Sequence, residues 1–147
     1  MTEKTDKEKF LDAHQKERDV LFSNEAFVIG VLQAVSGGSL FAALAQSEAL
    51  LKLAGSLSFL TFLTLMGISL ISAVLAAYWK HQYKMWDVKG RVSAAEGDLA
   101  QSQIRADSAG TYLTAMRRAM LVAVLGVVFG LGQFLLFAWV RALCPIV

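Results

Sequence analysis

Long apolar stretches alternate with charged stretches along the chain. Asp, Glu, Lys, Arg and His are all absent from three windows, at residues 26–47, 56–79 and 119–140. Because a helix rises about 1.5 Å per residue and the hydrocarbon core is about 30 Å thick, roughly 20 residues suffice to cross a bilayer. Each window is that long, so the pattern predicts three transmembrane helices. The alternative, a very hydrophobic soluble bundle, is disfavoured because a soluble helix usually keeps a polar face toward water.

The composition agrees with a membrane protein. Of the 147 residues, 56% are hydrophobic and only 18% are charged, whereas soluble domains are roughly 45–50% apolar. We therefore expect an all-α integral membrane protein with three transmembrane helices and a small cytoplasmic helical layer. Its predicted parts are an N-terminal amphipathic helix (1–23), a transmembrane hairpin (24–79, with spans at about 26–47 and 57–79), a helical segment (80–116) and a third transmembrane helix with a short end (117–147).

The basic residues predict the orientation of the chain. Twelve of the fourteen Lys and Arg residues lie before the first span or between the second and third spans, and only Lys52 and Arg141 lie on the opposite side. Since loops rich in Lys and Arg stay in the cytoplasm, we expect a cytoplasmic N-terminus and an external C-terminus. The favoured location is the bacterial inner (cytoplasmic) membrane, as a multi-pass protein.

Aromatic and basic side chains gather at the predicted membrane boundaries. Tyr and Trp favour the headgroup level because each has an apolar ring and a polar group. The predicted interface anchors are Tyr78, Trp79, Tyr83, Trp86, Arg117, Arg118 and Trp139. We also expect Lys80, Lys84, Arg117 and Arg118 to bind anionic lipid headgroups rather than nucleic acid, because they lie beside membrane spans.

Short motifs predict where the first helices begin. Thr5 and Glu8 have the spacing of a capping box, so a polar helix is expected from there to about Phe22. Ser23 offers a second start, with Phe22 and Phe27 at the positions of a hydrophobic staple. The first span would then bend away from the N-terminal helix; alternatively, one helix continues through this point.

Glycines predict where helices end. Gly55 is expected to end the first helix after an amphipathic turn, and Ser56 or Ser58 to cap the second helix. Gly90 is expected to weaken the second helix beyond the membrane. Residues 93–96 match a second capping box, which predicts that a new helix starts there.

An apolar stripe between the second and third spans needs a cover. It consists of Val88, Val92, Ala95 and Leu99, at helical spacing. The N-terminal helix carries a net negative charge, opposite to that of residues 80–118, and we expect it to dock on the stripe. Its candidate side chains are Phe10, Leu11, Ala13, Val20 and Leu21. The alternative is an N-terminal helix that does not dock.

Each predicted span has small residues at intervals of three or four. These predicted helix-packing interfaces are Gly30, Ala34, Gly38 and Ala42 in the first span, Ser69, Ala73 and Ala77 in the second, and Ala115, Ala119, Ala123, Gly126 and Gly130 in the third. Lipid tails are as apolar as leucine, so helices associate in a bilayer through close packing, which small residues permit. Either all three stripes face one another inside the chain, or at least one faces a partner.

The sequence offers no residue set for catalysis. The spans lack ionisable side chains, on which proton relays, ion coupling and substrate paths in membranes depend. His14 and His81 have no second ligand at metal-binding spacing, and Cys144 is the only cysteine. An enzyme acting on lipid is disfavoured because no catalytic constellation can be drawn. We therefore predict no catalytic residue, cofactor or metal site, and no enzyme activity.

Two functions fit a small membrane protein of this kind. The first is a non-catalytic accessory or assembly subunit of a larger membrane complex, which binds a membrane-protein partner through its helices. The second is a self-associating, pore-forming or membrane-perturbing effector. Hydroxyls of the second span support it, because Ser58, Thr61, Ser69 and Ser72 lie nearest to one helix face.

One family has a similar layout. A cytoplasmic helix, a hairpin with a short loop and a returning cytoplasmic helix over residues 6–107 resemble the SLATT effectors of bacterial conflict systems, in layout and without a shared residue motif. The resemblance implies pore formation, and the third span departs from it. Phage holins can also have three spans, but they typically carry a charged cytoplasmic C-terminus, unlike the end predicted here.

Overall fold

The protein is built from three long helices and one short one. The computed structural model describes residues 6–143, apart from the side chains of residues 6–14 and 17. Its helices are α1 (Asp6–Ala45), α2 (Ser47–Ala54), α3 (Ser56–Ala95) and α4 (Leu99–Leu143). Helices α1, α3 and α4 are each long and apolar enough to cross a membrane. The prediction of an all-α protein with three spans is confirmed, and the orientation in the membrane stays a prediction.

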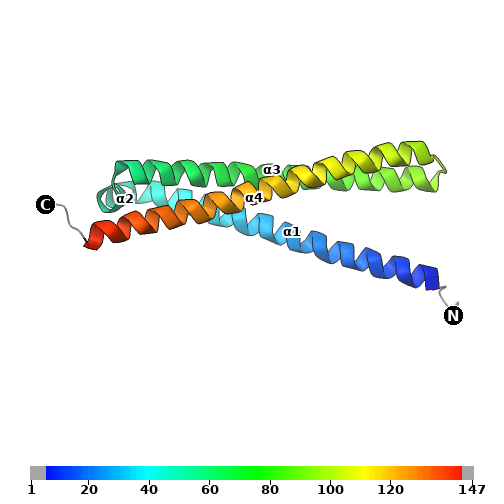
Figure 1. The fold of residues 1–147 in the computed structure, drawn as a ribbon, viewed down its shortest axis with the longest axis horizontal. Helices are drawn as coiled ribbons and strands as arrows, with labels where there is room; N and C mark the ends of the chain where they lie inside the picture. The colour runs from blue at the N-terminus through cyan, green and yellow to red at the C-terminus, as the bar shows by residue number, and fades with distance from the viewer. Residues whose placement is uncertain (1–5, 144–147) are drawn as a thin grey trace.

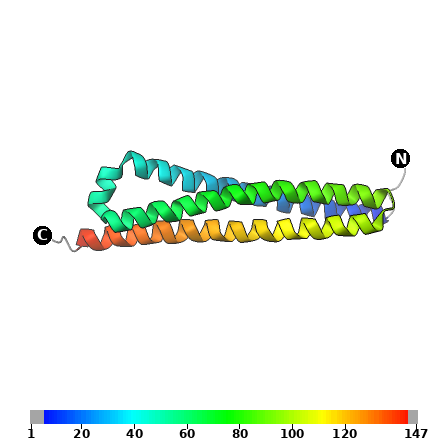
Figure 2. The same cartoon turned by 90° about the horizontal axis from the view of Figure 1, so that it is seen from above.

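Helices α3 and α4 form an antiparallel pair, and α1 packs mainly on α3. Figure 2 shows α3 and α4 side by side along their lengths, and Figure 1 shows α1 diverging from them toward its N-terminal end. That end of α1 and the turn between α3 and α4 lie at one end of the molecule (Figure 1). Helix α2 and the last turns of α4 lie at the other, as three successive crossings require.

The long helices extend well beyond a bilayer. With 40 residues in α1 and α3 and 45 in α4, each is about 60 Å long or more, twice the thickness of the hydrocarbon core. Helix α1 is continuous through Ser23, so the alternative without a bend is the one that the structure has. The helical layer outside the spans is therefore made of extensions of the spanning helices.

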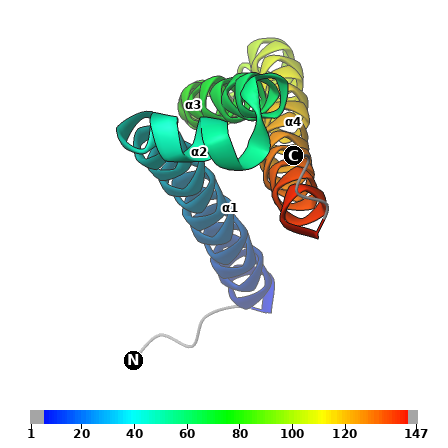
Figure 3. The ribbon, with the colours of Figure 1, turned by 90° about the vertical axis from the view of Figure 1, so that its left-hand side faces the viewer.

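The first helix ends earlier than the sequence predicted. Gln46 leaves helical geometry (φ −117°, ψ 27°), and the short α2 follows it before Gly55. Figure 3 shows α2 lying across the end of the molecule. This reversal lets Leu50 pack against the buried Phe59 and Phe62. The expected amphipathic turn that ends at Gly55 is present as α2, but it is a helix of its own, because the chain breaks at Gln46.

The turn before α3 depends on backbone conformation rather than on a serine cap. Gly55 has φ +83°, a value that favours glycine, and its N–H donates to Leu51 O at 2.9 Å. Gly55 is the N-cap of α3 and no side chain caps this end. The prediction of a Ser56 or Ser58 cap was therefore wrong, and the Ser58 hydroxyl is buried without a hydrogen-bond partner among the described residues.

The predicted break at Gly90 and the predicted helix start at 93–96 were also wrong. Helix α3 continues to Ala95, and the chain turns at Gly97 (φ +84°). Asp98 then caps α4, because its Oδ1 accepts a hydrogen bond from the Gln101 N–H at 3.0 Å. Gly90 instead lies inside α3 and is buried against α4, where a Cβ built on it would make an ordinary contact, 3.6 Å from Arg105 Cβ.

The N-terminal helix does not cover the apolar stripe beyond the second span. Val88, Val92 and Leu99 are exposed, and so are Val20 and Leu21 on α1. The predicted docking is wrong for these residues, because α3 and α4 pack through the opposite face and α1 continues straight away from them. Thr5 lies outside the described residues, and Phe10, Leu11 and Ala13 outside the described side chains.

Candidate functional site

The small residues of the third span pack directly against α3. A Cβ built on Gly126 would lie 2.9 Å from Ser69 Cβ and 3.0 Å from Leu65 O, so no larger residue fits without movement. A Cβ on Gly130 would lie 2.8 Å from Met66 Cε. Ala119 and Ala123 are buried in the same interface, and Ala115 is partly buried. On α3, Ser69 and Ala73 are fully buried, and Ala77 is partly buried against a cluster that includes Met116 and Ala119 of α4.

A hydrogen-bonded serine junction connects all three spans. Ser69 Oγ on α3 donates to Ala123 O on α4 at 2.8 Å, and Ser36 Oγ on α1 lies 2.7 Å from Ser69 Oγ. Because a hydroxyl has one proton and that of Ser69 goes to Ala123, Ser36 donates to Ser69. Both serines are fully buried. Sequence reasoning missed this junction, although a serine near the middle of two different spans was a usable signal.

The small residues of the first span do not pack inside the chain. Gly30, Ala34, Gly38 and Ala42 are all exposed, and a Cβ built on either glycine would have nothing within 4 Å. The prediction of an internal packing interface fails for this stripe. Helix α1 instead turns a different face toward α3, made of Ile29, Leu32, Ser36 and Ala43. The hydrogen bond of Ser36 and the burial of larger apolar side chains decide its rotation.

Large apolar side chains flank the exposed stripe. We call this surface the outer α1 face; it comprises Gly30, Ala34, Gly38 and Ala42 with the neighbouring Phe27, Val31 and Phe41. Phe27 is 72% exposed and Phe41 is 78% exposed within the chain. The outer α1 face therefore combines shallow and protruding positions, the relief that a second helix needs to interlock with it.

A cluster of aromatic and basic side chains connects α1 to α3 at the boundary of the span. Lys80 is only 8% exposed, and its Nζ donates a hydrogen bond to Phe22 O on α1. The Nζ atoms of Lys80 and Lys84 lie 5.9 and 5.8 Å from the centroid of the Phe22 ring. Tyr83 packs on the same ring, with centroids 5.2 Å apart. Lys80 and Tyr83 are thus internal, which corrects their predicted contact with headgroups.

Burial governs the ionisation of this cluster. It lowers the pKa of Lys80, and the nearby Glu25 carboxylate opposes part of that effect. Burial also raises the pKa of Tyr83, and the charge of Asp87 adds to the rise. Glu25 Oε2 is buried and has no hydrogen-bond partner among the described residues. Among the described side chains, Lys80 therefore sits in this cluster without a close ion pair.

The other predicted anchors differ in their surroundings. Tyr78 and Trp139 are exposed, and so are Lys84, Arg117 and Arg118. Trp86 is partly buried, and Lys89 Nζ lies 5.3 Å from its ring. Trp79 is partly buried beside α4. Five of these side chains are thus exposed and can meet lipid headgroups, although Lys84 also lies over the Phe22 ring.

The part of the chain that the structure describes holds no group of three or more His, Cys, Asp or Glu side chains arranged for a metal ion. The side chains of His14 and Cys144 lie outside that part. Comparisons with protein-family models, with curated proteins and with solved structures each gave no match. The geometry supports a helical protein with three candidate membrane spans, joined at one buried serine junction.

Proposed function

We propose that the chain is a non-catalytic accessory or assembly subunit of a larger membrane complex, and that it binds a partner helix on the outer α1 face. The observation that carries this proposal is the exposure of Gly30, Ala34, Gly38 and Ala42 in a span. Small residues do not improve the packing of lipid tails on a helix, whereas they let a second helix approach closely enough for extensive van der Waals contact. The third span illustrates that use, because Gly126 brings α4 against the α3 backbone.

The proposed setting is the bacterial inner membrane with the N-terminus in the cytoplasm. The distribution of Lys and Arg supports this orientation, since only Lys52 and Arg141 lie at the opposite end. The absence of ionisable residues from the three windows supports a role in association rather than in catalysis.

A self-associating pore is the second candidate, and the hydroxyls of α3 give it less support. A pore needs polar groups that face its water column. Thr61 and Thr64 donate to the carbonyl oxygens of Leu57 and Leu60 in their own helix, and Ser69 donates to α4. These three hydroxyls already have acceptors, and the Ser58 hydroxyl, which has no partner among the described residues, is buried inside the chain.

The test compares leucine substitutions at two glycines that have the same free space within the chain. Gly38 lies on the outer α1 face and Gly132 lies on α4, both are exposed, and a Cβ on either would have nothing within 4 Å. Each variant is extracted gently from its native membrane and its assemblies are measured by native mass spectrometry. We expect Gly38→Leu to lose a distinct membrane-protein partner that the unmodified chain and Gly132→Leu both retain.

A photo-crosslinking residue supplies an independent readout. Placed at Ala34 on the outer α1 face, it should capture the same partner; placed at Val128, an exposed position on α4, it should capture lipid. A discrete homo-oligomer without a second protein would contradict the accessory role and favour the pore, to be followed by conductance. A monomer in both variants and in the parent would count against both functions.

A further inference from the structure

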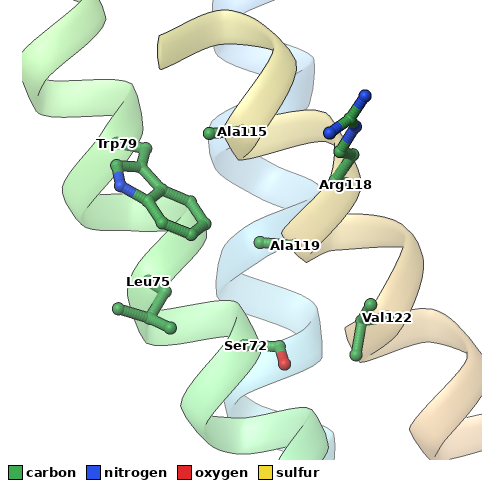
Figure 4. Close-up of a pocket in the computed structure, with 7 residues that line it drawn as sticks. All are labelled: Ser72, Leu75, Trp79, Ala115, Arg118, Ala119 and Val122. Atoms are coloured by element: carbon green, nitrogen blue, oxygen red, sulfur yellow. The ribbon is translucent and has the colours of Figure 1, made fainter. Parts of the chain in front are cut away.

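A groove lies between α3 and α4 near the basic end of the molecule. Its volume is about 380 Å³, and it is lined by Ser72, Leu75, Trp79, Ala115, Arg118, Ala119 and Val122. Figure 4 shows the Trp79 ring projecting from α3 toward Ala115 and Ala119 on α4. Helix α1 lies behind the pair in this view, so the groove opens on the face turned away from α1. It is thus separate from the outer α1 face.

The lining changes from charged to apolar along the groove. Arg118 directly precedes the charge-free window of α4, and Trp79 is the last residue of the window of α3. Both are therefore at the predicted headgroup level. Ser72 lies seven residues before Trp79, which places it about 10 Å deeper along the helix. The groove has a cationic mouth and an apolar path into one leaflet.

The small side chains of α4 create the space. Ala115 and Ala119 face the groove, and a longer residue at either position would fill it (Figure 4). In the same view Arg118 rises from α4 beside Ala115 and Ala119, on the side away from Trp79. Among the described side chains the Arg118 guanidinium has no ion-pair partner, the one such pair being that of Arg91 with Asp87. Its donors are available to a ligand.

We infer that this groove binds one anionic phospholipid of the leaflet on the basic side. The phosphate group would accept hydrogen bonds from Arg118, whose guanidinium matches phosphate oxygens in geometry and charge. One acyl chain would lie along Leu75 and Val122, beside the Trp79 ring. A partner helix is the competing occupant, and the guanidinium at the mouth favours lipid because a transmembrane helix would leave that charge unpaired.

Fluorescence quenching of Trp79 tests the site. The chain has three tryptophans, and the double substitution Trp86→Phe and Trp139→Phe leaves Trp79 as the one emitter. The full chain is reconstituted into phosphatidylcholine vesicles that contain increasing fractions of acyl-brominated phosphatidylglycerol or acyl-brominated phosphatidylcholine. We expect half-maximal quenching at about a fivefold lower fraction of the anionic lipid, the preference that one basic residue near a membrane surface confers.

Three further variants locate the effect. Arg118→Gln should make the two quenching curves coincide, whereas Arg117→Gln, which removes an equal charge outside the groove, should keep their separation. Ala115→Leu should reduce quenching by both lipids while the circular dichroism of the chain stays helical. Equal losses in the two arginine variants would overturn the site in favour of a diffuse surface charge. Absence of quenching together with a dimer in native mass spectrometry would show that a second helix occupies the groove.

Discussion

The first and third spans carry similar stripes of small residues in opposite surroundings. On α4, Gly126 faces the α3 backbone so closely that an added Cβ would lie 3.0 Å from Leu65 O. On α1, Gly38 is exposed, and an added Cβ would have nothing within 4 Å. A small-residue stripe therefore shows that a helix can be approached closely. Whether the approaching helix belongs to the same chain depends on how each helix is rotated.

The serine junction explains the different rotations. Ser69 belongs to the small face of α3, and its hydroxyl bonds to Ala123 O on the small face of α4, so these two faces meet. Ser36 reaches Ser69 from α1, but it lies on the opposite side of that helix from Ala34 and Gly38. Satisfying the Ser36 hydroxyl in an apolar medium consequently turns the small face of α1 outward.

The largest expected effect is from an added methyl group in the buried stripe. Gly126→Ala should lower the free energy of unfolding by about 1–3 kcal/mol, because the methyl collides with Ser69 Cβ and Leu65 O. Reversible unfolding in detergent, followed by circular dichroism, measures the change. The control is Gly132→Ala on the same helix, where nothing lies within 4 Å. Equal effects at the two glycines would contradict the packing described here.

Removing the Phe22 ring should loosen α1 from α3. Phe22→Ala eliminates the ring contact with Tyr83 and the positions of Lys80 and Lys84 over the ring. We expect a loss of about 1–2 kcal/mol, confined to this connection. Amide hydrogen exchange in residues 18–28 should accelerate. Phe27→Ala, at a position that is 72% exposed, should leave the exchange unchanged; acceleration in both would assign the effect to the helix itself.

Breaking the serine junction should have a moderate effect. Ser69→Ala removes both hydrogen bonds of the junction, and hydrogen bonds between membrane helices contribute about 1 kcal/mol. Ser36→Ala should cost less, because the bond from Ser69 to Ala123 remains. The free energy of unfolding of both variants is compared with that of Thr64→Ala, whose hydroxyl bonds within its own helix. A larger loss for Ser36→Ala than for Ser69→Ala would contradict the assigned direction of the bonds.

On the exposed stripe of α1, a glycine-to-alanine substitution should not lower the free energy of unfolding. Gly38→Ala should leave the stability of the isolated chain unchanged or raise it by less than about 0.5 kcal/mol, since alanine loses less backbone freedom in a helix than glycine. The measurement is the same unfolding titration as for Gly126→Ala. Destabilisation of the isolated chain would mean that the outer α1 face is covered by another part of the protein.

The smallest expected effect is an ionisation shift at the edge of the span. Burial raises the pKa of Tyr83 above its ordinary value of 10.0, so the fold favours the neutral phenol. The corresponding stability is present below pH 10 and is lost as the pH rises through the raised pKa. Ultraviolet absorbance of the phenolate follows this titration, and Tyr83→Phe should remove a step that lies above pH 10. Loss of a step at or below pH 10 would place Tyr83 in contact with water.

The sequence predicted the spans well and the helix boundaries poorly. The three windows without charge fall on α1, α3 and α4, apart from the last two residues of the first window, because a bilayer crossing leaves a long apolar signal. Gly90 looked like a break but is helical and buried against α4, whereas the turn occurs at Gly97. The sequence does not show which glycine lies inside a helix and which lies in a turn. The structure does, because it places Gly90 opposite Arg105 on α4 and gives Gly97 a positive φ.

The candidate site was predicted in its residue types and not in its arrangement. The small residues of all three spans were identifiable, and those of α3 and α4 lie together. Lys80 could not be assigned from sequence, since its contact with Phe22 O joins residues 58 positions apart. The groove at Trp79 and Arg118 likewise needs two helices to be placed side by side.

Hydrophobic patterning alone determined that the chain is helical and has three candidate spans, because the length and polarity of a segment are properties of that segment. The tertiary structure decided which face each span turns inward. That choice depends on pairs of positions distant in sequence, such as Ser36 with Ser69 and Gly126 with Leu65. In a medium where every helix is apolar all round, such hydrogen bonds and close contacts are the forces that select one rotation.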